Sequence, residues 1–312
     1  MPVGSYAVAS DTGRRRRRNE DNYVVAPPLF AVADGMGGAQ AGEVASQLAA
    51  SALEAGDTDA LEGTKRLHAL IQEANRRIYD RASTDPTASG MGTTMTVALV
   101  EGMTVAIGHV GDSRAYLVRS EHMEQLTEDH SLVNELVKTG RLSEQEAQIH
   151  PQRSVITRAV GTDPDVDVDV FTIEAEEGDV FLICSDGLSD MVADEEILEV
   201  VHTNRDDLEQ AVKALVAAAN RGGGEDNITA VAFRISGEPT ASLEDTVSMP
   251  ALGDEDEPDE ETREYVASDQ PPEPAALPAA QPTAGPRRVR LVLFGVAVVA
   301  VVAALLVWGL TR

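Results

Sequence analysis

The sequence predicts a layered α+β domain, and three observations support this fold class. Short runs rich in β-branched and aromatic residues gather in clusters along residues 1–236. Amphipathic helical patterns separate these clusters, in pairs rather than singly after each strand. Strict alternation would favour a doubly wound parallel sheet, whereas clustered strands favour antiparallel sheets flanked by helices. With 312 residues, 43% of them hydrophobic, the chain can bury a sizeable core.

The individual elements follow from the period of the hydrophobic pattern. Strands are expected, in chain order, at residues 5–10, 22–26, 29–34, 93–100, 103–110, 114–119, 167–173, 179–186 and 227–235. Helices are expected at residues 42–53, 61–82, 132–139, 195–202 and 208–220. No internal repeat accompanies them.

Charge and cysteine content exclude several classes of protein. Lys and Arg number 25 against 53 Asp and Glu, a net charge of −28. Such a chain repels phosphate backbones, so nucleic acid is not expected as a partner. Cys184 is the single cysteine, which excludes a disulfide framework and a cysteine-based zinc site and suits a reducing compartment. An acidic enzyme and an acidic binding module both remain possible.

Two segments after residue 236 differ in composition from the predicted domain. Residues 237–286 hold 13 acidic residues, a single arginine and nine of the fifteen prolines, which predicts a disordered linker. Residues 291–310 are twenty residues without a charge, enough for a helix of about 30 Å across a bilayer. Arg287, Arg288 and Arg290 precede this stretch, so we expect a single-pass cell-membrane anchor with residues 1–236 in the cytoplasm.

Aspartates recur where predicted strands begin or end. Asp34, Asp112 and Asp186 each follow an apolar run, and Asp226 directly precedes one. An ionised carboxylate beside buried β-structure is costly unless it is paired or binds a cation. Oxygen ligands suit hard divalent cations such as Mg²⁺ and Mn²⁺. One such aspartate indicates only a solvated turn, but four in an acidic chain indicate a metal centre.

Five consecutive arginines precede the acidic pair Glu20 and Asp21 in TGRRRRRNED. A run of this kind can be a solvated basic loop or an electrostatic patch. Beside a carboxylate–metal cluster, an arginine can instead bind two phosphate oxygens through its planar fork. Spacing alone does not choose among the arginines at positions 14–18.

The ordered motifs Arg…NED, ADGMGG, GDSR, SDGLSD and GGxxDN resemble the metal-dependent Ser/Thr protein phosphatases of the type 2C (PPM) family, in particular bacterial membrane-anchored members. The resemblance covers residues 4–236. It implies a four-layer α-β-β-α sandwich of two antiparallel sheets with a metal centre at one end. It also implies hydrolysis of phosphoserine and phosphothreonine by a metal-activated water.

The resemblance assigns roles to individual positions. Asp34 matches the carboxylate that bridges two Mn²⁺ or Mg²⁺ ions, and the carbonyl of Gly35 matches a further ligand. Arg16, five residues before Asp21, matches the phosphate-binding arginine, so Arg16 and Asp34 are the predicted catalytic residues. Met36 stands where some relatives carry a histidine proposed as general acid, so that role does not transfer. The remaining predicted metal-site residues are Asp186 and Asp226 as ligands, Asp112 at a third site with Asp186 and with Asp190 as a further candidate, and Glu20 and Asp21 holding waters of the centre.

Histidine and cysteine positions point to structure rather than chemistry. Residues 131–163 resemble the family's flap, where we expect His150 to be structural or to gate substrate. His109 and His130 are expected to be hydrogen-bonded structural residues, and Cys184 a buried apolar residue. The competing function is a non-catalytic, phosphatase-like sensing module at the membrane. The expected partners are phosphorylated proteins, among them membrane Ser/Thr kinases and their targets.

Overall fold

The structure is a computed structural model that describes residues 2–37, 41–56 and 61–237. The predicted membrane span at 291–310, and all but the first residue of the predicted linker at 237–286, lie outside these ranges. Within the described residues, none of the helices combines the length and the apolar character that crossing a bilayer requires.

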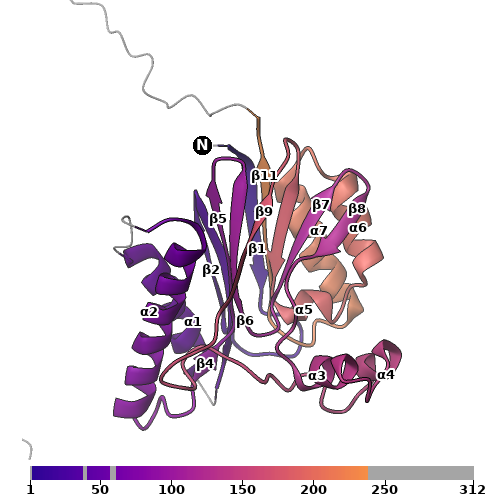
Figure 1. Cartoon of the computed structure of the whole chain (residues 1–312). Coiled ribbons are helices and arrows are strands. Elements are labelled where there is room, and N and C mark those ends of the chain that lie inside the picture. The colour runs from indigo at the N-terminus through magenta and orange to yellow at the C-terminus, as the bar shows by residue number, and fades with distance from the viewer. Residues whose placement is uncertain (1, 38–40, 57–60, 238–312) are drawn as a thin grey trace, which may run out of the picture. The chain divides into compact units, whose positions relative to one another are not determined.

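Two antiparallel sheets form the inner layers of the fold (Figure 1), as the sequence predicts. One sheet has the order β1-β11-β10-β7-β8, formed by Val3–Asp11, Ile228–Ile235, Val180–Cys184, Arg114–Arg119 and His122–Gln125. The other has the order β2-β3-β5-β6-β9, formed by Asp21–Ala26, Leu29–Met36, Met95–Glu101, Thr104–Val110 and Asp169–Glu174. The short strand β4 (Gly92–Thr93) pairs with β3.

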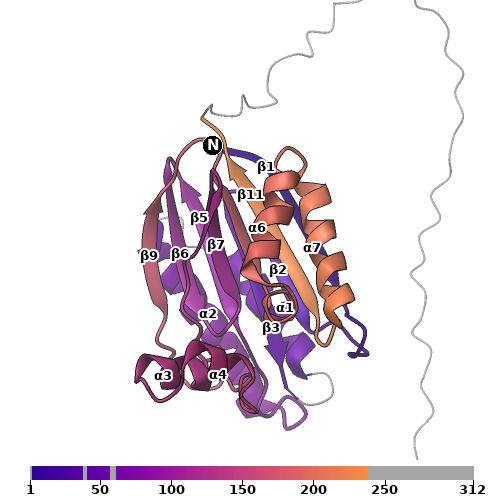
Figure 2. The ribbon, with the colours of Figure 1, turned by 90° about the vertical axis from the view of Figure 1, so that its right-hand side faces the viewer.

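Helices cover the outer face of each sheet (Figures 1 and 2). α1 (Ala41–Ala55) and α2 (Gly63–Thr84) pack on the sheet of β2, β3, β5 and β6. α6 (Asp194–Thr203) and α7 (Leu208–Gly222) pack on the other sheet. Their buried residues recur at helical spacing, as Leu208, Val212, Leu215 and Ala219 do in α7. The predicted helix–sheet–sheet–helix layering is therefore confirmed for the described residues.

The core between the sheets is centred on three stacked phenylalanines. The Phe233 ring lies 4.3 Å from that of Phe30 and 5.1 Å from that of Phe181, centroid to centroid, and both pairs are nearly parallel. Phe30 comes from β3 in one sheet, and the other two come from β11 and β10 in the other sheet. Each such pair contributes about 0.5–1.5 kcal/mol beyond the area it buries. The stack thereby helps to fix the two sheets face to face.

Four short elements were not predicted. They are β4, β8, the one-turn helix α5 (Asp186–Ser189) and α4 (Glu144–Gln148). β8 reads HMEQ, which has no apolar alternation because it is an exposed edge strand. β4 ends at Thr93 and β5 begins at Met95, so the single strand expected at 93–100 is divided there. α4 and α3 (Leu132–Lys138) project at the end of the sandwich where β4 lies (Figures 1 and 2).

Candidate metal and phosphate site

Carboxylates from distant parts of the chain converge around Asp34. Asp21 on β2 is the direct register partner of Asp34 on β3. Desolvation raises the pKa of Asp34 well above its usual range, and the negative charges of Asp21, Asp186, Asp112 and Asp226 raise it further. The other three aspartates predicted from the strand pattern therefore lie close enough to Asp34 to raise its pKa.

The topology explains why these segments meet. Asp112 lies in the turn where the chain leaves β6 of one sheet and enters β7 of the other. Asp186 begins α5 directly after β10, and Asp226 comes just before β11, the neighbour of β10. Asp34 lies within β3, which continues to Met36, so the expected strand end at this residue is wrong by two positions. One end of the sandwich thus collects the acidic residues.

Buried oxygen atoms in this cluster lack partners among the described residues. They are Oδ1 of Asp21, Oδ1 of Asp112 and Oδ1 of Asp186. The other Asp21 oxygen accepts hydrogen bonds from Ser185 Oγ at 2.8 Å and Thr229 Oγ1 at 2.7 Å. Unpaired buried carboxylate oxygens are costly, and a divalent cation would satisfy them. The donor set therefore fits hard metal ions such as Mn²⁺ and Mg²⁺.

The charge state of the cluster supports the same interpretation. Burial raises the pKa of Asp21 to about 6 and that of Asp112 to about 7. It also raises the pKa of Asp186, to which the charges of Asp112 and Asp190 add. No three His, Cys, Asp or Glu side chains in the described part of the chain already stand as a preformed metal-binding group. Mg²⁺ characteristically keeps several waters, so carboxylates that do not close a cage by themselves still fit such an ion.

Gly35 is held where a side chain would not fit. Its N–H donates to the carbonyl of Glu20 at 3.1 Å. A Cβ atom built on Gly35 would lie 2.1 Å from the carbonyl oxygen of Gly42 and 2.6 Å from that of Glu20. Glycine is therefore required for the close approach of β3, α1 and the segment before β2. The role of the Gly35 carbonyl as a metal ligand stays a prediction.

Hydroxyl groups of Thr94, between β4 and β5, and of Thr96 in β5 connect Asp34 with the Asp112 turn. Thr94 Oγ1 accepts a hydrogen bond from the backbone N–H of Asp34 at 2.9 Å. The same oxygen lies 2.8 Å from Ser113 Oγ, and Thr96 Oγ1 donates to the Ser113 carbonyl at 3.0 Å. These threonines were not predicted as site residues, because nothing in the apolar run that contains them indicates their contacts.

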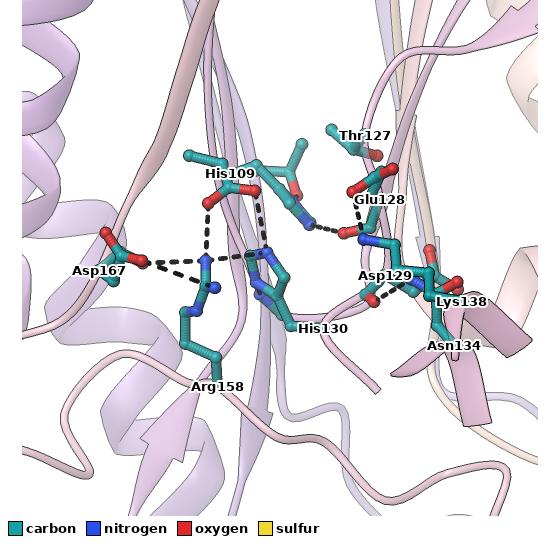
Figure 3. A network of polar contacts seen from close by, with 12 residues as sticks. His109, Thr127, Glu128, Asp129, His130, Asn134, Lys138, Arg158 and Asp167 are labelled. Atoms are coloured by element: carbon teal, nitrogen blue, oxygen red, sulfur yellow. Dashed lines mark hydrogen bonds and ion pairs between the residues drawn. The ribbon is translucent and has the colours of Figure 1, made fainter. Parts of the chain in front are cut away.

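Two histidines close in sequence or space to the Asp112 turn belong to a network of polar contacts (Figure 3). His130 Nδ1 accepts from the N–H of Gly111 at 3.0 Å, and its Nε2 lies 3.2 Å from Asp169 and 3.0 Å from Arg158. His109 Nε2 lies 3.0 Å from the Glu128 carbonyl, and burial lowers the pKa of this imidazole to about 4. Both are buried and hydrogen-bonded, which confirms the structural interpretation.

Of the five arginines, the structure brings Arg16 to the cluster. Arg16 Nη2 lies 2.6 Å from Asp226 Oδ2. Arg14 Nε donates instead to the Asn220 carbonyl at 2.8 Å. Arg18 lies 3.5 Å from Glu43. The position that the family motif selects is therefore the one in contact with a predicted metal ligand.

The predicted flap residues 131–163 contain α3 and α4. Arg153 of this segment lies 3.5 Å from Asp190 and 3.7 Å from Glu225, near the carboxylate cluster. His150 Nδ1 accepts from the N–H of Gln152 at 3.2 Å, a local contact within the flap. Burial raises the pKa of Cys184 to about 12, so this thiol is not a nucleophile, as predicted.

Asn227 is the functional residue that sequence reasoning missed. Its Nδ2 donates to the carbonyls of Thr12 at 3.0 Å and Arg18 at 2.8 Å, the two ends of the arginine segment. Its Oδ1 accepts from the N–H of Glu20 at 2.7 Å. One buried amide therefore fastens the arginine loop to Asp226. The signal was present in GGGEDN, where a polar amide separates an aspartate from a buried strand.

Asn227→Ala should therefore displace Arg16 and destabilise the chain. It leaves two carbonyls and one N–H without partners, at a cost of about 1–3 kcal/mol for each buried group that water cannot reach. We expect a lower Tm and a raised KM for phosphopeptides. The matched control is Asn220→Ala, which loses one exposed hydrogen bond to Asp11 and should change both quantities little. A wild-type Tm and KM for Asn227→Ala would contradict this role.

Comparison with known proteins adds an independent observation. The family model described as protein phosphatase 2C matches residues 17–228. The serine/threonine phosphatase stp of Listeria innocua is 42% identical over 231 residues, which cover 70% of this chain and 91% of that protein. The serine/threonine protein phosphatase PstP of Mycobacterium tuberculosis is 40% identical over 254 residues, which cover 81% of this chain and 49% of that protein.

Solved structures give the same result. The crystal structure of the catalytic domain of PstP in complex with two manganese ions superposes with a TM-score of 0.69 at 40% identity. The match covers 75% of this chain and 99% of that one. Sequence motifs, layered fold, carboxylate cluster and relatives all agree, and the chain belongs to the protein phosphatase 2C family.

Proposed function

We propose that the chain is a metal-dependent protein phosphatase that hydrolyses phosphoserine and phosphothreonine in proteins. The observation that carries this proposal is the convergence of Asp21, Asp34, Asp186 and Asp226 beside the guanidinium of Arg16. An arginine fork next to oxygen ligands suits a phosphate monoester held against divalent cations. The non-catalytic alternative is disfavoured, because Asp34, Asp186 and Asp226 are all present and the charges of Asp186 and Asp226 act on Asp34.

The predicted site residues have different roles in the proposed hydrolysis of the phosphate ester. Two divalent ions in the cluster would lower the pKa of a water, which supplies the nucleophile near neutral pH. Asp34, Asp186, Asp226 and the Gly35 carbonyl would hold these ions, and Asp112 would serve a third site. The free Oδ1 of Asp21 can accept a hydrogen bond from a water of the centre.

Arg16 would bind the non-bridging oxygens of the phosphoryl group and stabilise the charge that develops on them. Met36 has no proton to donate, so protonation of the leaving group falls to solvent within the centre. A covalent phosphocysteine is excluded, because Cys184 is fully buried and its pKa is raised to about 12.

The manganese-bound PstP structure supports Mn²⁺, with Mg²⁺ as the alternative. The full chain should hydrolyse phosphothreonine peptides with Mn²⁺ and lose this activity in EDTA, because the cluster alone supplies no nucleophile. Activity should return on adding Mn²⁺ back, measured as phosphate release. Undiminished hydrolysis in EDTA would contradict the metal mechanism.

We further propose that residues 291–310 anchor the protein in the cell membrane, with residues 1–236 on the cytoplasmic side. The uncharged stretch and the preceding arginines at 287, 288 and 290 support this orientation. Substrates would then include membrane Ser/Thr kinases and their targets. Recovery of the full chain in the soluble fraction after cell lysis without detergent would contradict the anchor.

A further inference from the structure

The loop between β1 and β2 carries two arginines that the proposed mechanism does not use. Arg14, Arg16 and Arg18 each contact a partner, as described above. Arg15 and Arg17 are exposed, and neither side chain makes a hydrogen bond or ion pair with any described residue. Arginines with and without partners therefore alternate along the run.

Such unpaired arginines are uncommon in this protein. The net charge is −28, and the other arginines of the described ranges have a contact, nearly all with a carboxylate or carbonyl, with Arg141 as the one further exception there. Carboxylates are in excess, yet Arg15 and Arg17 contact none of those in the described part of the chain. No side chain in these ranges therefore competes with an incoming anion for the two guanidinium groups.

The backbone that carries them is held firmly beside the candidate site. The N–H groups of Arg14 and Arg15 both donate to the Gly224 carbonyl, at 2.7 and 3.2 Å. Gly13 has a φ of +77°, and a Cβ there would lie 2.1 Å from the Asp226 carbonyl oxygen. Together with the Asn227 clamp, these contacts fix the loop against the segment of Asp226. A preorganised backbone reduces the entropy lost on binding.

The spacing places both side chains within reach of a bound phosphopeptide. Adjacent Cα atoms are about 3.8 Å apart, so Arg15 and Arg17 start one residue to either side of Arg16. Two residues of an extended peptide span about 7 Å. When Arg16 holds a phosphate, groups within two positions of the phosphorylated residue therefore pass the neighbouring arginines.

We propose that Arg15 and Arg17 form a docking subsite for anionic groups that flank the target phosphoresidue, namely acidic side chains or a second phosphate. This rests on the proposed function, because Arg16 must hold the phosphate that is hydrolysed. The guanidinium fork binds carboxylate and phosphate alike through two parallel hydrogen bonds. Because an acidic chain repels anionic substrates, a local cationic pair strongly affects which of them bind.

A peptide fits these observations better than a lipid surface does. The two arginines are the immediate sequence neighbours of Arg16, which contacts Asp226, and the backbone of Arg15 is bonded to Gly224 close to Asp226, so a ligand bound by them lies beside the candidate catalytic centre. A peptide segment can carry its phosphate to Arg16 and its flanking charges to Arg15 and Arg17 at once. A membrane seated there would cover the centre.

The experiment compares peptides of one sequence that differ only in the flanking residues. The three peptides carry phosphothreonine with alanine flanks, with glutamate at the two positions on each side, or with a second phosphothreonine two positions away. Binding is measured for the full chain with Mn²⁺, using versions with a non-hydrolysable phosphonate, and kcat/KM is measured for the phosphopeptides.

The variants are Arg15→Ala/Arg17→Ala and the charge-retaining Arg15→Lys/Arg17→Lys. The control is Lys65→Ala, an exposed cation of α2 near the β5–β6 hairpin, at the other end of the sheet.

We expect the wild type to bind both anionic peptides about tenfold more tightly than the alanine-flanked one, and less so at high salt. The double alanine variant should bind all three peptides about equally, the lysine variant should retain part of the preference, and Lys65→Ala should retain all of it. Tighter binding of the diphosphorylated peptide but not of the glutamate-flanked peptide would also support the proposal, and it would identify diphosphorylated segments as the substrates.

Equal binding of all three peptides by the wild type would overturn the proposal, while hydrolysis would leave the phosphatase function standing. Preferential binding of the anionic peptides without any hydrolysis would contradict the proposed phosphatase function but would still support the subsite. Two further results would overturn the subsite. One is Arg15- and Arg17-dependent binding of phosphatidylserine vesicles without peptide preference. The other is equally tight binding of an unphosphorylated peptide of residues 253–262, the chain's own acidic sequence.

Discussion

Asp34→Ala is expected to abolish phosphopeptide hydrolysis while leaving the chain folded. The carboxylate of Asp34 stands at the centre of the cluster, where Asp21, Asp186, Asp112 and Asp226 all raise its pKa. If it bridges two dications, its removal takes one ligand from each. It would also remove a negative charge that offsets the repulsion between two such ions. We therefore expect a loss of at least about a thousandfold in kcat/KM, together with weak binding of metal.

Asp34→Ala should lower activity, but it should not lower the thermal stability of the metal-free protein. Burial raises the pKa of Asp21 to about 6 and of Asp112 to about 7, whereas an unfolded aspartate has a pKa of about 3.9. Between these values the folded chain holds more protons than the unfolded chain. The free energy of unfolding of the metal-free protein therefore falls as the pH rises from about 4 to 7. Asp34→Ala removes one of the interacting charges, so its metal-free Tm at pH 7 should equal or exceed that of the wild type.

Calorimetric titration with Mn²⁺ and thermal unfolding in EDTA measure both effects. Asp34→Asn keeps the shape of the side chain and should bind metal weakly and hydrolyse slowly. Asp112→Ala is the matched control, because it should leave the pair of ions bound and reduce turnover through the third site. Tight binding of two Mn²⁺ ions by Asp34→Ala, with turnover near the wild-type rate, would show that Asp34 is not the bridging ligand.

The fold could be predicted wherever one residue pattern decides the structure. The apolar alternation of β-strands and the buried stripe of α7 gave element types and bounds within a few residues. β8 was missed because an exposed edge strand buries too little to show a period. α4 was missed although Ser143 and Glu146 form a capping box, since a helix of five residues has no full apolar face.

The candidate site could be predicted only in part, for a related reason. An ionised carboxylate next to a buried strand has a high desolvation free energy unless it has a partner. Local sequence was therefore enough to single out Asp34, Asp112, Asp186 and Asp226. Asn227 acts on backbone carbonyls more than 200 positions earlier in the chain, at Thr12 and Arg18. Such contacts depend on which loops the β1–β11 pairing brings together. The motif GGGEDN marks a polar amide beside a buried strand, but it does not name the carbonyls that this amide binds.

Arg16→Ala is expected to raise the KM for phosphopeptides about ten- to a hundredfold, with a smaller change in kcat. A charged hydrogen bond of this kind is worth about 1.5–3 kcal/mol. The chain should stay folded, because the Arg16–Asp226 ion pair is half exposed on the arginine side and contributes at most about 1 kcal/mol to stability. Kinetics across peptide concentration, with Tm as the folding check, measure both quantities.

Substitutions of the neighbouring arginines are the controls for Arg16→Ala. Arg14 and Arg18 contact the Asn220 carbonyl and Glu43 instead of Asp226, so Arg14→Ala and Arg18→Ala should change KM much less. Arg16→Lys keeps the charge but not the fork and should fall between wild type and alanine. Loss of Arg16 should weaken the binding of neutral-flanked and acidic-flanked phosphopeptides alike. Loss of Arg15 and Arg17 should instead weaken mainly the binding of the acidic-flanked ones. Equal effects at positions 14, 16 and 18 would instead mean that the run attracts phosphate only as a diffuse charge, with no single arginine committed to the reacting group.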